Sequence, residues 1–489
     1  MSRLNTSFKY YSLLFAFVFS VNTMAQVKKV KVPAPIYPVP TAKQLAWHKM
    51  EMNAFIHFTT NTFTDKEWGY GDESNSVFNP TNVDANQWAK ILKETGFKMM
   101  ILTTKHHDGF CIWPSKFTEH SIKNSSYKNG NGDIVKETSE AAKKVGLKFG
   151  VYLSPWDRNR ADYGQPSYVT YYRNQLKELF TQYGKVTEMW FDGANGGDGF
   201  YGGANEKREI DGKTFYQWPE TLKLIRSIQP NVVFFSDAGP DIRWVGNEEG
   251  RAGRTNWNNI SMDTLYAGKS GIENLLNAGT VEGKNWVPAE VDVSIRPGWF
   301  YHAKEDNLVK TPEKLFEIYL SSVGRGSNLL LNVPPDRTGQ FHANDVSSLQ
   351  GFASILKKEL GKNLAKKAIV KVDSYRGKAL DFSAKNLTDG KKDTYWATND
   401  NVKTAQLEIN LGSKQTVKYI LLQEYIQLGQ RVKAFSIDVW KDGNWQTITT
   451  ETTIGYKRII KISPEQTDKI RVSILDAKAC PVLSNIEVY

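Results

Sequence analysis

The chain has few cysteines and, beyond its first 25 residues, no long apolar run. Cys111 and Cys480 are the only cysteines among 489 residues, which excludes a fold that depends on a disulfide framework. No later segment approaches the roughly 20 consecutive apolar residues of a transmembrane helix. Internal repeats and low-complexity tracts are absent too, which argues against solenoid and disordered architectures.

Dense basic runs are also missing, although the chain is basic overall. Lys and Arg number 63 against 52 Asp and Glu, a formal net charge of +11. Because the lysines are scattered along the sequence, this excess indicates a solvated basic surface and not a nucleic-acid site.

The first 25 residues have the pattern of a secretory signal peptide. Arg3 and Lys9 precede an apolar stretch over residues 10–21, and small residues then lead to Ala25. This stretch is too short and wrongly flanked for a membrane span. Because Gln26 and not cysteine follows, no lipid anchor is indicated. We expect an exported protein, periplasmic or secreted, that is not held in a membrane.

Residues 26–360 alternate between short apolar runs and helix-like segments. The alternation predicts βαβ units and a parallel sheet, and about eight repeats in this length favour a (β/α)8-like barrel. One strand of the eight, the seventh, has no clear candidate. The expected strands cover residues 52–58, 99–104, 147–154, 187–192, 232–236, 287–293 and 328–333.

A lysine-rich stretch over residues 362–367 marks the end of this pattern. From residue 366 to residue 489 the chain shows short alternating segments separated by turn residues, as at 442–444. Many short strands with turn signals predict an all-β sandwich. We therefore expect an α/β barrel followed by an all-β domain.

Polar side chains gather where the expected barrel strands end. His57, His106 with His107, Tyr152 and Asp192 end the first four, and in a barrel all strand ends meet at one catalytic face. A carboxylate there, with a second carboxyl group on a loop, is the minimum for glycoside hydrolysis. Aromatic side chains beside these ends can stack on sugars, namely Trp68, Trp190, Trp244 and Trp299.

A catalytic metal is not expected. His106 and His107 are adjacent, so on a strand they point to opposite faces. The spaced histidine pairs typical of metal hydrolases do not occur in this region.

Five short motifs together resemble glycoside hydrolase family 29, the α-L-fucosidases. The motifs lie at residues 55–58, 67–69, 105–110, 152–156 and 190–193. Each is weak alone, but their order and spacing are specific, and the resemblance extends from about residue 47 to residue 360. It implies a (β/α)8-like barrel and a retaining mechanism without metal, acting on a fucosylated oligosaccharide.

The resemblance also implies residue roles. Asp192 matches the nucleophile of the family. The positions that hold the fucose are matched by His57, Glu67, Trp68, His106, His107 and Tyr152. Buried polar groups matched to the sugar hydroxyls would reject sugars that lack those hydroxyls.

The acid/base residue differs between branches of the family. Residues 239–250 look like the branch acting on α-1,3/1,4-linked fucose, in which the first Glu after a Gly-Asn pair is the acid/base. This assigns Glu248, with Glu249 as its rival. A Glu near position 290 serves in the other branch, so Glu290 would be the acid/base of a broad-specificity enzyme. In the α-1,3/1,4 branch, Glu290 and Trp299 are expected to shape the leaving-group side.

The C-terminal segments 387–390, 394–397 and 484–489 resemble discoidin-type or family 32 carbohydrate-binding modules. Such modules sometimes hold a structural Ca²⁺ near the first of these motifs, on Asp carboxylates and backbone carbonyls. No cofactor is expected for catalysis. A fucose-binding protein without catalysis is the alternative from another class, and retention of Asp192 and Glu248 argues against it.

Overall fold

The computed structural model describes residues 1–2 and 30–489. The predicted signal peptide therefore lies outside the described residues apart from its first two. The chain divides into a unit over residues 1–32 and a compact unit over residues 33–489. No helix in the described part is long and apolar enough to cross a membrane.

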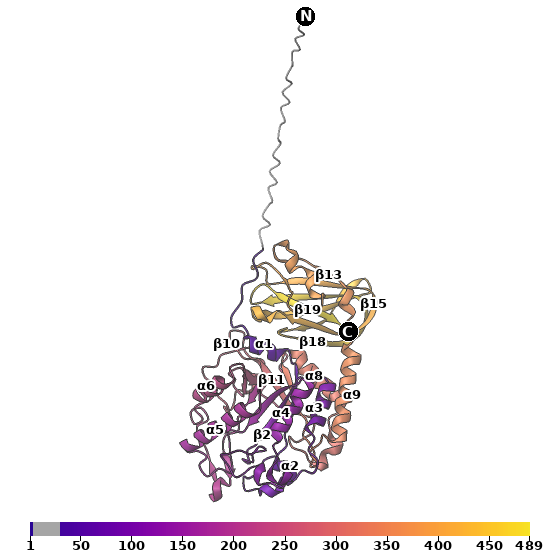
Figure 1. Cartoon of the computed structure of the whole chain (residues 1–489). Helices are drawn as coiled ribbons and strands as arrows, with labels where there is room; N and C mark the ends of the chain where they lie inside the picture. The colour runs from indigo at the N-terminus through magenta and orange to yellow at the C-terminus, as the bar shows by residue number, and fades with distance from the viewer. Residues whose placement is uncertain (3–29) are drawn as a thin grey trace. The chain divides into compact units, whose positions relative to one another are not determined.

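Within residues 30–489, eight parallel strands close into a barrel in the order β1-β12-β11-β8-β7-β4-β3-β2. Figure 1 shows β2 and β11 of this barrel with helices around them. The predicted barrel is thus confirmed. Most strands are short and buried on both faces, as expected when helices cover a parallel sheet. The barrel strands are β1 (Met52–Ile56), β2 (Met99–Lys105), β3 (Lys148–Leu153), β4 (Glu188–Trp190), β7 (Val233–Ser236), β8 (Ile242–Trp244), β11 (Ala289–Ser294) and β12 (Asn328–Asn332).

The sixth barrel strand is β8, which the sequence pattern does not reveal. It follows β7 after a five-residue turn with no helix between them, so the strand predicted as sixth, over residues 287–293, is the seventh. β8 has only three residues, and its central residue is the buried Arg243. The Arg243 guanidinium donates to the carbonyls of Leu276 and Trp257, so a charged residue occupies a position where an apolar run would be expected.

Several helices begin or end at local sequence signals. Asp84, Asp133 and Thr311 cap helix N-termini with their side chains, as short polar side chains do. Gly146 ends α4 in the left-handed conformation, which glycine adopts without strain. The helices of the barrel region are α1 (Ala42–His48), α2 (Thr60–Thr64), α3 (Ala85–Glu94), α4 (Ile134–Val145), α5 (Pro166–Gln182), α6 (Trp218–Ile228), α7 (Glu273–Ala278), α8 (Pro312–Ser321) and α9 (Ala343–Leu360).

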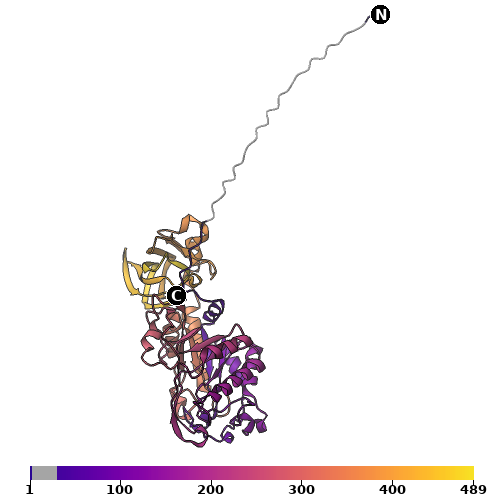
Figure 2. The ribbon, with the colours of Figure 1, turned by 90° about the vertical axis from the view of Figure 1, so that its left-hand side faces the viewer.

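The C-terminal domain is antiparallel, with the strand order β14-β19-β15-β18-β16-β17 and with β13 paired to β15. It appears in orange and yellow in Figure 2. Two strands, β15 and β18, are each 20 residues long, longer than the short strands expected from the sequence, and they pair with two register shifts. The bounds are β13 (Ile369–Val372), β14 (Trp396–Ala397), β15 (Ala405–Glu424), β16 (Val432–Lys441), β17 (Asn444–Glu451), β18 (Arg458–Ala477) and β19 (Val482–Val488).

Two small hairpin-like sheets complete the fold. β5 (Gly197–Gly199) pairs with β6 (Glu206–Arg208) in the glycine-rich insertion after β4, and β9 (Asn259–Ile260) pairs with β10 (Asn285–Trp286) between β8 and β11. The β5–β6 pair follows the carboxyl end of β4, whereas β10 lies just before β11, where Trp286 packs with Leu45 of α1 and with Ile426 and Tyr456 of the C-terminal domain.

Candidate active site

A cavity of about 440 Å³ lies at the carboxyl ends of the barrel strands. Among the described residues that line it, four are carboxylic acids, three are histidines and none is a lysine or arginine. The lining is Phe55, His57, Trp68, His106, His107, Tyr152, Trp190, Asp192, Gly193, Ala194, Asp237, Trp244, Glu248, Asp292 and Trp299.

Asp192 follows β4 by two residues and is held on both carboxyl oxygens. Its Oδ2 accepts a hydrogen bond from the Tyr152 hydroxyl at 3.0 Å, and its Oδ1 accepts from the Ala194 backbone N–H at 2.8 Å. The His107 Nε2 lies 3.8 Å from Oδ2. Because a quarter of the side chain remains exposed, the carboxylate is fixed in orientation and still open to a ligand.

Tyr152 stays protonated and therefore acts as a donor to Asp192. Burial, together with the negative charge of Asp192, raises the pKa of the Tyr152 phenol well above its ordinary value. The ring itself packs between the imidazoles and Trp190, at 5.5 Å from the Trp190 ring.

Hydrogen bonds fix the tautomers of His57 and His107. Asn332 uses its Nδ2 to donate to Ser294 and to the Trp299 carbonyl, so its Oδ1 accepts from His57 Nδ1 at 2.9 Å. Ser154 donates to a carbonyl, so its Oγ accepts from His107 Nδ1 at 2.7 Å. Each neutral ring then carries its lone pair on Nε2, ready to accept from a hydroxyl.

His106 has the opposite tautomer. The Asn61 Nδ2, which also donates to the Glu67 carbonyl, donates to His106 Nδ1 at 3.3 Å. The proton of the neutral His106 ring is therefore on Nε2. His106 is thus a hydrogen-bond donor, while His57 and His107 are acceptors.

All three imidazoles are neutral. Burial is the main cause in each case, and it lowers the pKa of His57 to about 3 and that of His107 to about 4. The pKa of His106 is lowered well below its ordinary value, by burial and then by its histidine neighbours. Neutral hydrogen-bond donors and acceptors suit the hydroxyl groups of an uncharged sugar better than they suit the charged groups of an ionic ligand.

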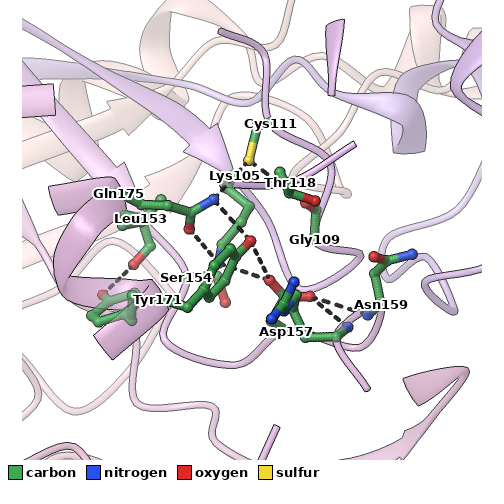
Figure 3. Close-up of polar contacts among 12 residues, drawn as sticks. Lys105, Gly109, Cys111, Thr118, Leu153, Ser154, Asp157, Asn159, Tyr171 and Gln175 are labelled. Carbon is green, nitrogen blue, oxygen red and sulfur yellow. Dashed lines mark hydrogen bonds and ion pairs between the residues drawn. The ribbon is translucent and has the colours of Figure 1, made fainter. Parts of the chain in front are cut away.

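A buried ion pair between Lys105 and Asp157 lies next to the segment that carries His106 and His107, and Figure 3 shows the polar contacts of this pair. The fully buried Lys105 Nζ donates to Asp157 Oδ2 at 2.9 Å and to Gln175 Oε1 at 3.0 Å. The Tyr171 hydroxyl joins the same group, because it donates to Asp157 and accepts from Gln175. Gly109 leaves room for this pair, since a Cβ atom there would lie 2.3 Å from Asp157 Oδ1.

The ion pair links the two loops that carry His107 and its partner. The His107 carbonyl accepts from the Arg158 backbone N–H at 2.8 Å, and the Lys105 carbonyl accepts from the Ser154 N–H at 2.9 Å. Lys105 and Asp157 therefore tie the end of β2 to the loop after β3, and His107 is oriented between them.

The structure separates Glu248 from its rival Glu249. Glu248 lines the cavity and accepts a hydrogen bond from Trp299 Nε1 at 3.2 Å, whereas Glu249 pairs with Arg251 on the surface. Partial withdrawal from bulk water raises the pKa of Glu248 above its ordinary value, and the charges of Asp192 and Glu67 add to this.

Glu67 is absent from the described residues that line the cavity, although its side chain is 39% exposed, and its predicted contact with fucose stays a prediction. Its carboxylate accepts from the Trp299 backbone N–H at 2.8 Å and from His302 Nε2 at 2.6 Å. It therefore fixes the loop that presents the Trp299 ring. Trp68, next to it, does line the cavity, and its ring contacts that of His107 edge-on at 5.2 Å.

The prediction that Glu290 shapes the leaving-group side of the site is wrong, because Glu290 does not lie at the cavity. Glu290 is fully buried inside the barrel beside Glu188 and does not line the cavity. Alternate residues of a strand share one face, and on β11 it is Asp292, two residues nearer the carboxyl end, that reaches the cavity.

Sequence reasoning missed Asp237 as well as Asp292. Asp237 directly follows β7, so the rule that polar residues at strand ends form the site would have found it. Asp292 gave no such signal, since it lies within a strand. Burial raises the pKa of Asp237 to about 6 and that of Asp292 well above its ordinary value.

Among the described residues no group of three or more His, Cys, Asp or Glu side chains could hold a metal ion. In the C-terminal domain, Asp389 uses its two oxygens to accept from the Lys391 N–H and the Thr394 hydroxyl, each at 2.8 Å. The structural Ca²⁺ near this motif stays a prediction.

Two family models match the chain. The model described as Alpha-L-fucosidase covers residues 34–362, and the model described as F5/8 type C domain covers residues 369–487. Alpha-L-fucosidase 1 of Arabidopsis thaliana is 39% identical over 487 residues, which span 97% of this chain and 93% of that protein.

Solved structures agree with this match. A glycoside hydrolase 29 family member from an unknown rumen bacterium is 44% identical, with a TM-score of 0.84 over 94% of this chain and 78% of that chain. A family 29 fucosidase of Ruminococcus gnavus, solved in complex with fucose, is 35% identical, with a TM-score of 0.84 over 94% of this chain and 96% of that chain. The chain therefore belongs to glycoside hydrolase family 29 and is an α-L-fucosidase with a C-terminal F5/8 type C domain.

Proposed function

We propose that this enzyme removes terminal α-1,3- or α-1,4-linked L-fucose from oligosaccharides and glycoconjugates with net retention of configuration. Asp192 is the nucleophile and Glu248 is the acid/base. The observation that carries the proposal is that one cavity contains an anchored, accessible Asp192 carboxylate and a Glu248 whose pKa is raised above its ordinary value.

The first step breaks the glycosidic bond. Asp192 attacks the anomeric carbon of the fucose while Glu248 gives its proton to the leaving oxygen, so a covalent fucosyl-enzyme and a free hydroxyl on the leaving sugar result. In the second step Glu248, now ionised, takes a proton from water, and the water oxygen displaces Asp192 from the anomeric carbon. Both carboxyl groups return to their starting states.

The three imidazoles and Tyr152 hold the fucose in this mechanism. His57 and His107 accept from sugar hydroxyls through Nε2, and His106 donates through Nε2–H, as their tautomers allow. The aromatic rings of Trp68 and Trp299 cover the apolar face and the methyl group of the sugar. The related fucosidase of Ruminococcus gnavus, whose structure was solved in complex with fucose, supports fucose as the ligand.

The linkage preference rests on the segment at residues 239–250. This segment resembles that of the α-1,3/1,4 branch, and Glu248 within it lines the cavity. The position of Glu290 inside the barrel disfavours the broad-specificity alternative, because a residue that does not reach the cavity cannot protonate a leaving group there.

The test is a rate comparison on purified protein. Lewis-type trisaccharides, an α-1,2-linked fucosyl-lactose and an aryl fucoside are the substrates, and NMR follows the anomer first released. We expect the trisaccharides to be cleaved fastest with α-fucose as the first product. Asp192→Ala and Glu248→Gln should lose at least ~10³-fold in kcat, whereas Glu249→Gln, the matched control, should not. First release of β-fucose would refute the retaining mechanism.

We also propose export of the enzyme, on the basis of its N-terminal sequence. Mass spectrometry of the mature protein from its native host should find Gln26 at the N-terminus. Detection of an intact Met1 terminus in the cytoplasmic fraction would refute this.

A further inference from the structure

The cavity has two chemically different halves. His57, His106, His107 and Tyr152, from β1 to β3, form what we call the imidazole half. Asp237, Glu248 and Asp292, from β7, the loop after β8 and β11, form the carboxyl half. Asp192 follows β4, which lies between β3 and β7 in the closed barrel, so the proposed nucleophile stands at the boundary of the two halves.

Strand register places Asp237 beside Asp192. β4 and β7 pair with Trp190 opposite Phe235, and each carboxyl group lies two residues beyond this pair. The backbone next to Asp192 packs directly against Asp237, because a Cβ atom at Gly193 would lie 1.9 Å from Asp237 Oδ2. Asp237 is therefore in direct contact with the turn that carries the nucleophile.

Only backbone groups bind the Asp237 carboxyl among residues 30–489. Its Oδ2 accepts from the Gly268 N–H at 2.8 Å, and its own backbone N–H also donates. A carboxyl group has about four lone-pair sites, so it keeps capacity for a further partner. Since it lines the cavity and is only partly buried, that partner must come from the cavity.

The leaving group must occupy the carboxyl half. If the fucose lies in the imidazole half, Glu248 has to reach the oxygen on the far side of the scissile bond, and that oxygen belongs to the next sugar. Burial, together with the negative charges of Asp192 and Glu248, raises the pKa of Asp237 to about 6. The three carboxyl groups line the same cavity.

We infer that Asp237 is a specificity-determining residue that hydrogen-bonds a hydroxyl group of the leaving saccharide next to the scissile bond. This inference rests on the proposed function. It means that the enzyme selects a hydroxylated, saccharide leaving group over an aryl group of the same leaving ability. The loop at Gly268 orients the carboxyl group for this purpose.

The experiment compares two substrate classes. Asp237→Asn keeps an oxygen for the Gly268 N–H but removes the charge, and Asp237→Ala removes the contact. A hydrogen bond to a charged group contributes enough that its loss should lower kcat/KM for the best oligosaccharide substrate about 10- to 100-fold. An aryl fucoside has no hydroxyl on its leaving group, so its kcat/KM should change less than about threefold.

Asp263→Asn is the matched control. Asp263 lies in the neighbouring loop, is exposed and pairs with Lys284 at 3.2 Å, so this change removes an equal charge outside the cavity and should leave both substrates unaffected. Circular dichroism and thermal unfolding verify that all variants are folded.

Three outcomes would overturn the inference. Equal losses on both substrates would assign Asp237 to the fucose or to the support of the loop. An equal downward shift of the basic limb of the pH profile on both substrates would assign it to the proton affinity of Glu248. A wild-type enzyme that cleaves aryl fucosides but no saccharide would exclude it as well. If the wild type prefers another fucosyl linkage, the proposed linkage fails, and the comparison is made with that oligosaccharide.

Discussion

Replacement of Lys105 by methionine should destabilise the barrel far more than the small change in side-chain volume suggests. Lys105 and Asp157 are completely buried and lie 2.9 Å apart, and the ammonium group also lies over the rings of Tyr168, Tyr171 and Tyr172 at 5.8, 5.2 and 5.6 Å. Lys105→Met fills nearly the same volume but leaves the Asp157 carboxylate in this enclosed site without a cation.

The magnitude follows from the burial. Removal of one member of a buried ion pair costs about 3–5 kcal/mol, because the other charge stays buried. The catalytic region of residues 34–362 should unfold with an entropy of roughly 0.7 kcal/mol/K, from about 2.1 cal/mol/K per residue. Division gives a fall in Tm of about 4–7 °C for Lys105→Met. Asp157→Asn, which leaves the ammonium, should also destabilise.

A double-mutant cycle measures the pair itself. Lys105→Met with Asp157→Asn contains no uncompensated charge, so the double variant should be more stable than the sum of the single losses by about 2 kcal/mol or more. Urea unfolding followed by tryptophan fluorescence gives the four free energies. If the two single effects simply add, Lys105 and Asp157 are not coupled and the reasoning is refuted.

Three further predictions concern the cavity and the barrel interior. Gly193→Ala should lower kcat at least tenfold without unfolding the protein, since its Cβ would displace Asp237; steady-state rates and a thermal scan decide this. The kcat should fall as pH rises through the raised pKa of Glu248, the proton donor; a profile flat to pH 9 would contradict the role. Glu188 and Glu290 bind protons more tightly in the folded protein than in the unfolded chain, because burial raises the pKa of Glu188 to about 7 and that of Glu290 well above its ordinary value. The free energy of unfolding should therefore fall between about pH 4.5 and 7, and Glu290→Gln should flatten this fall in urea titrations at several pH values.

The barrel could be predicted from sequence because most of its strands are buried on both faces. Runs such as Leu329–Leu331 are continuous and apolar, which marks a strand without any tertiary knowledge. β8 could not be found, because the charged Arg243 at its centre is stabilised in its buried position by hydrogen bonds to groups outside the strand, among them the Leu276 and Trp257 carbonyls and the Asn256 side chain. The two long strands of the C-terminal domain contain polar stretches, at residues 412–416 and 463–468, so the sequence pattern indicates shorter strands on either side of each.

The site could be predicted where function depends on strand ends. His57, His106, Tyr152 and Asp192 all lie at the cavity, since every parallel strand of a barrel delivers its last residue to the same face. Depth within a strand is harder to predict. Glu290 and Asp292 share a face of β11 and differ by one step along it, and only the closed barrel decides which of them reaches the cavity.

The proposed mechanism requires that one carboxyl group in the cavity is ionised while a second one nearby keeps its proton. The residues that line the cavity meet this requirement. No cation lines the described cavity to favour ionisation in general. Burial and mutual repulsion raise the pKa of Asp237, Glu248 and Asp292, while Asp192 alone receives both a phenol donor and a backbone donor. The other three acids thus hold their protons to higher pH than free carboxyl groups do, while the two hydrogen bonds orient the Asp192 carboxyl group for attack. The neutral histidines complete this arrangement, since a protonated imidazole would lower the proton affinity that Glu248 needs.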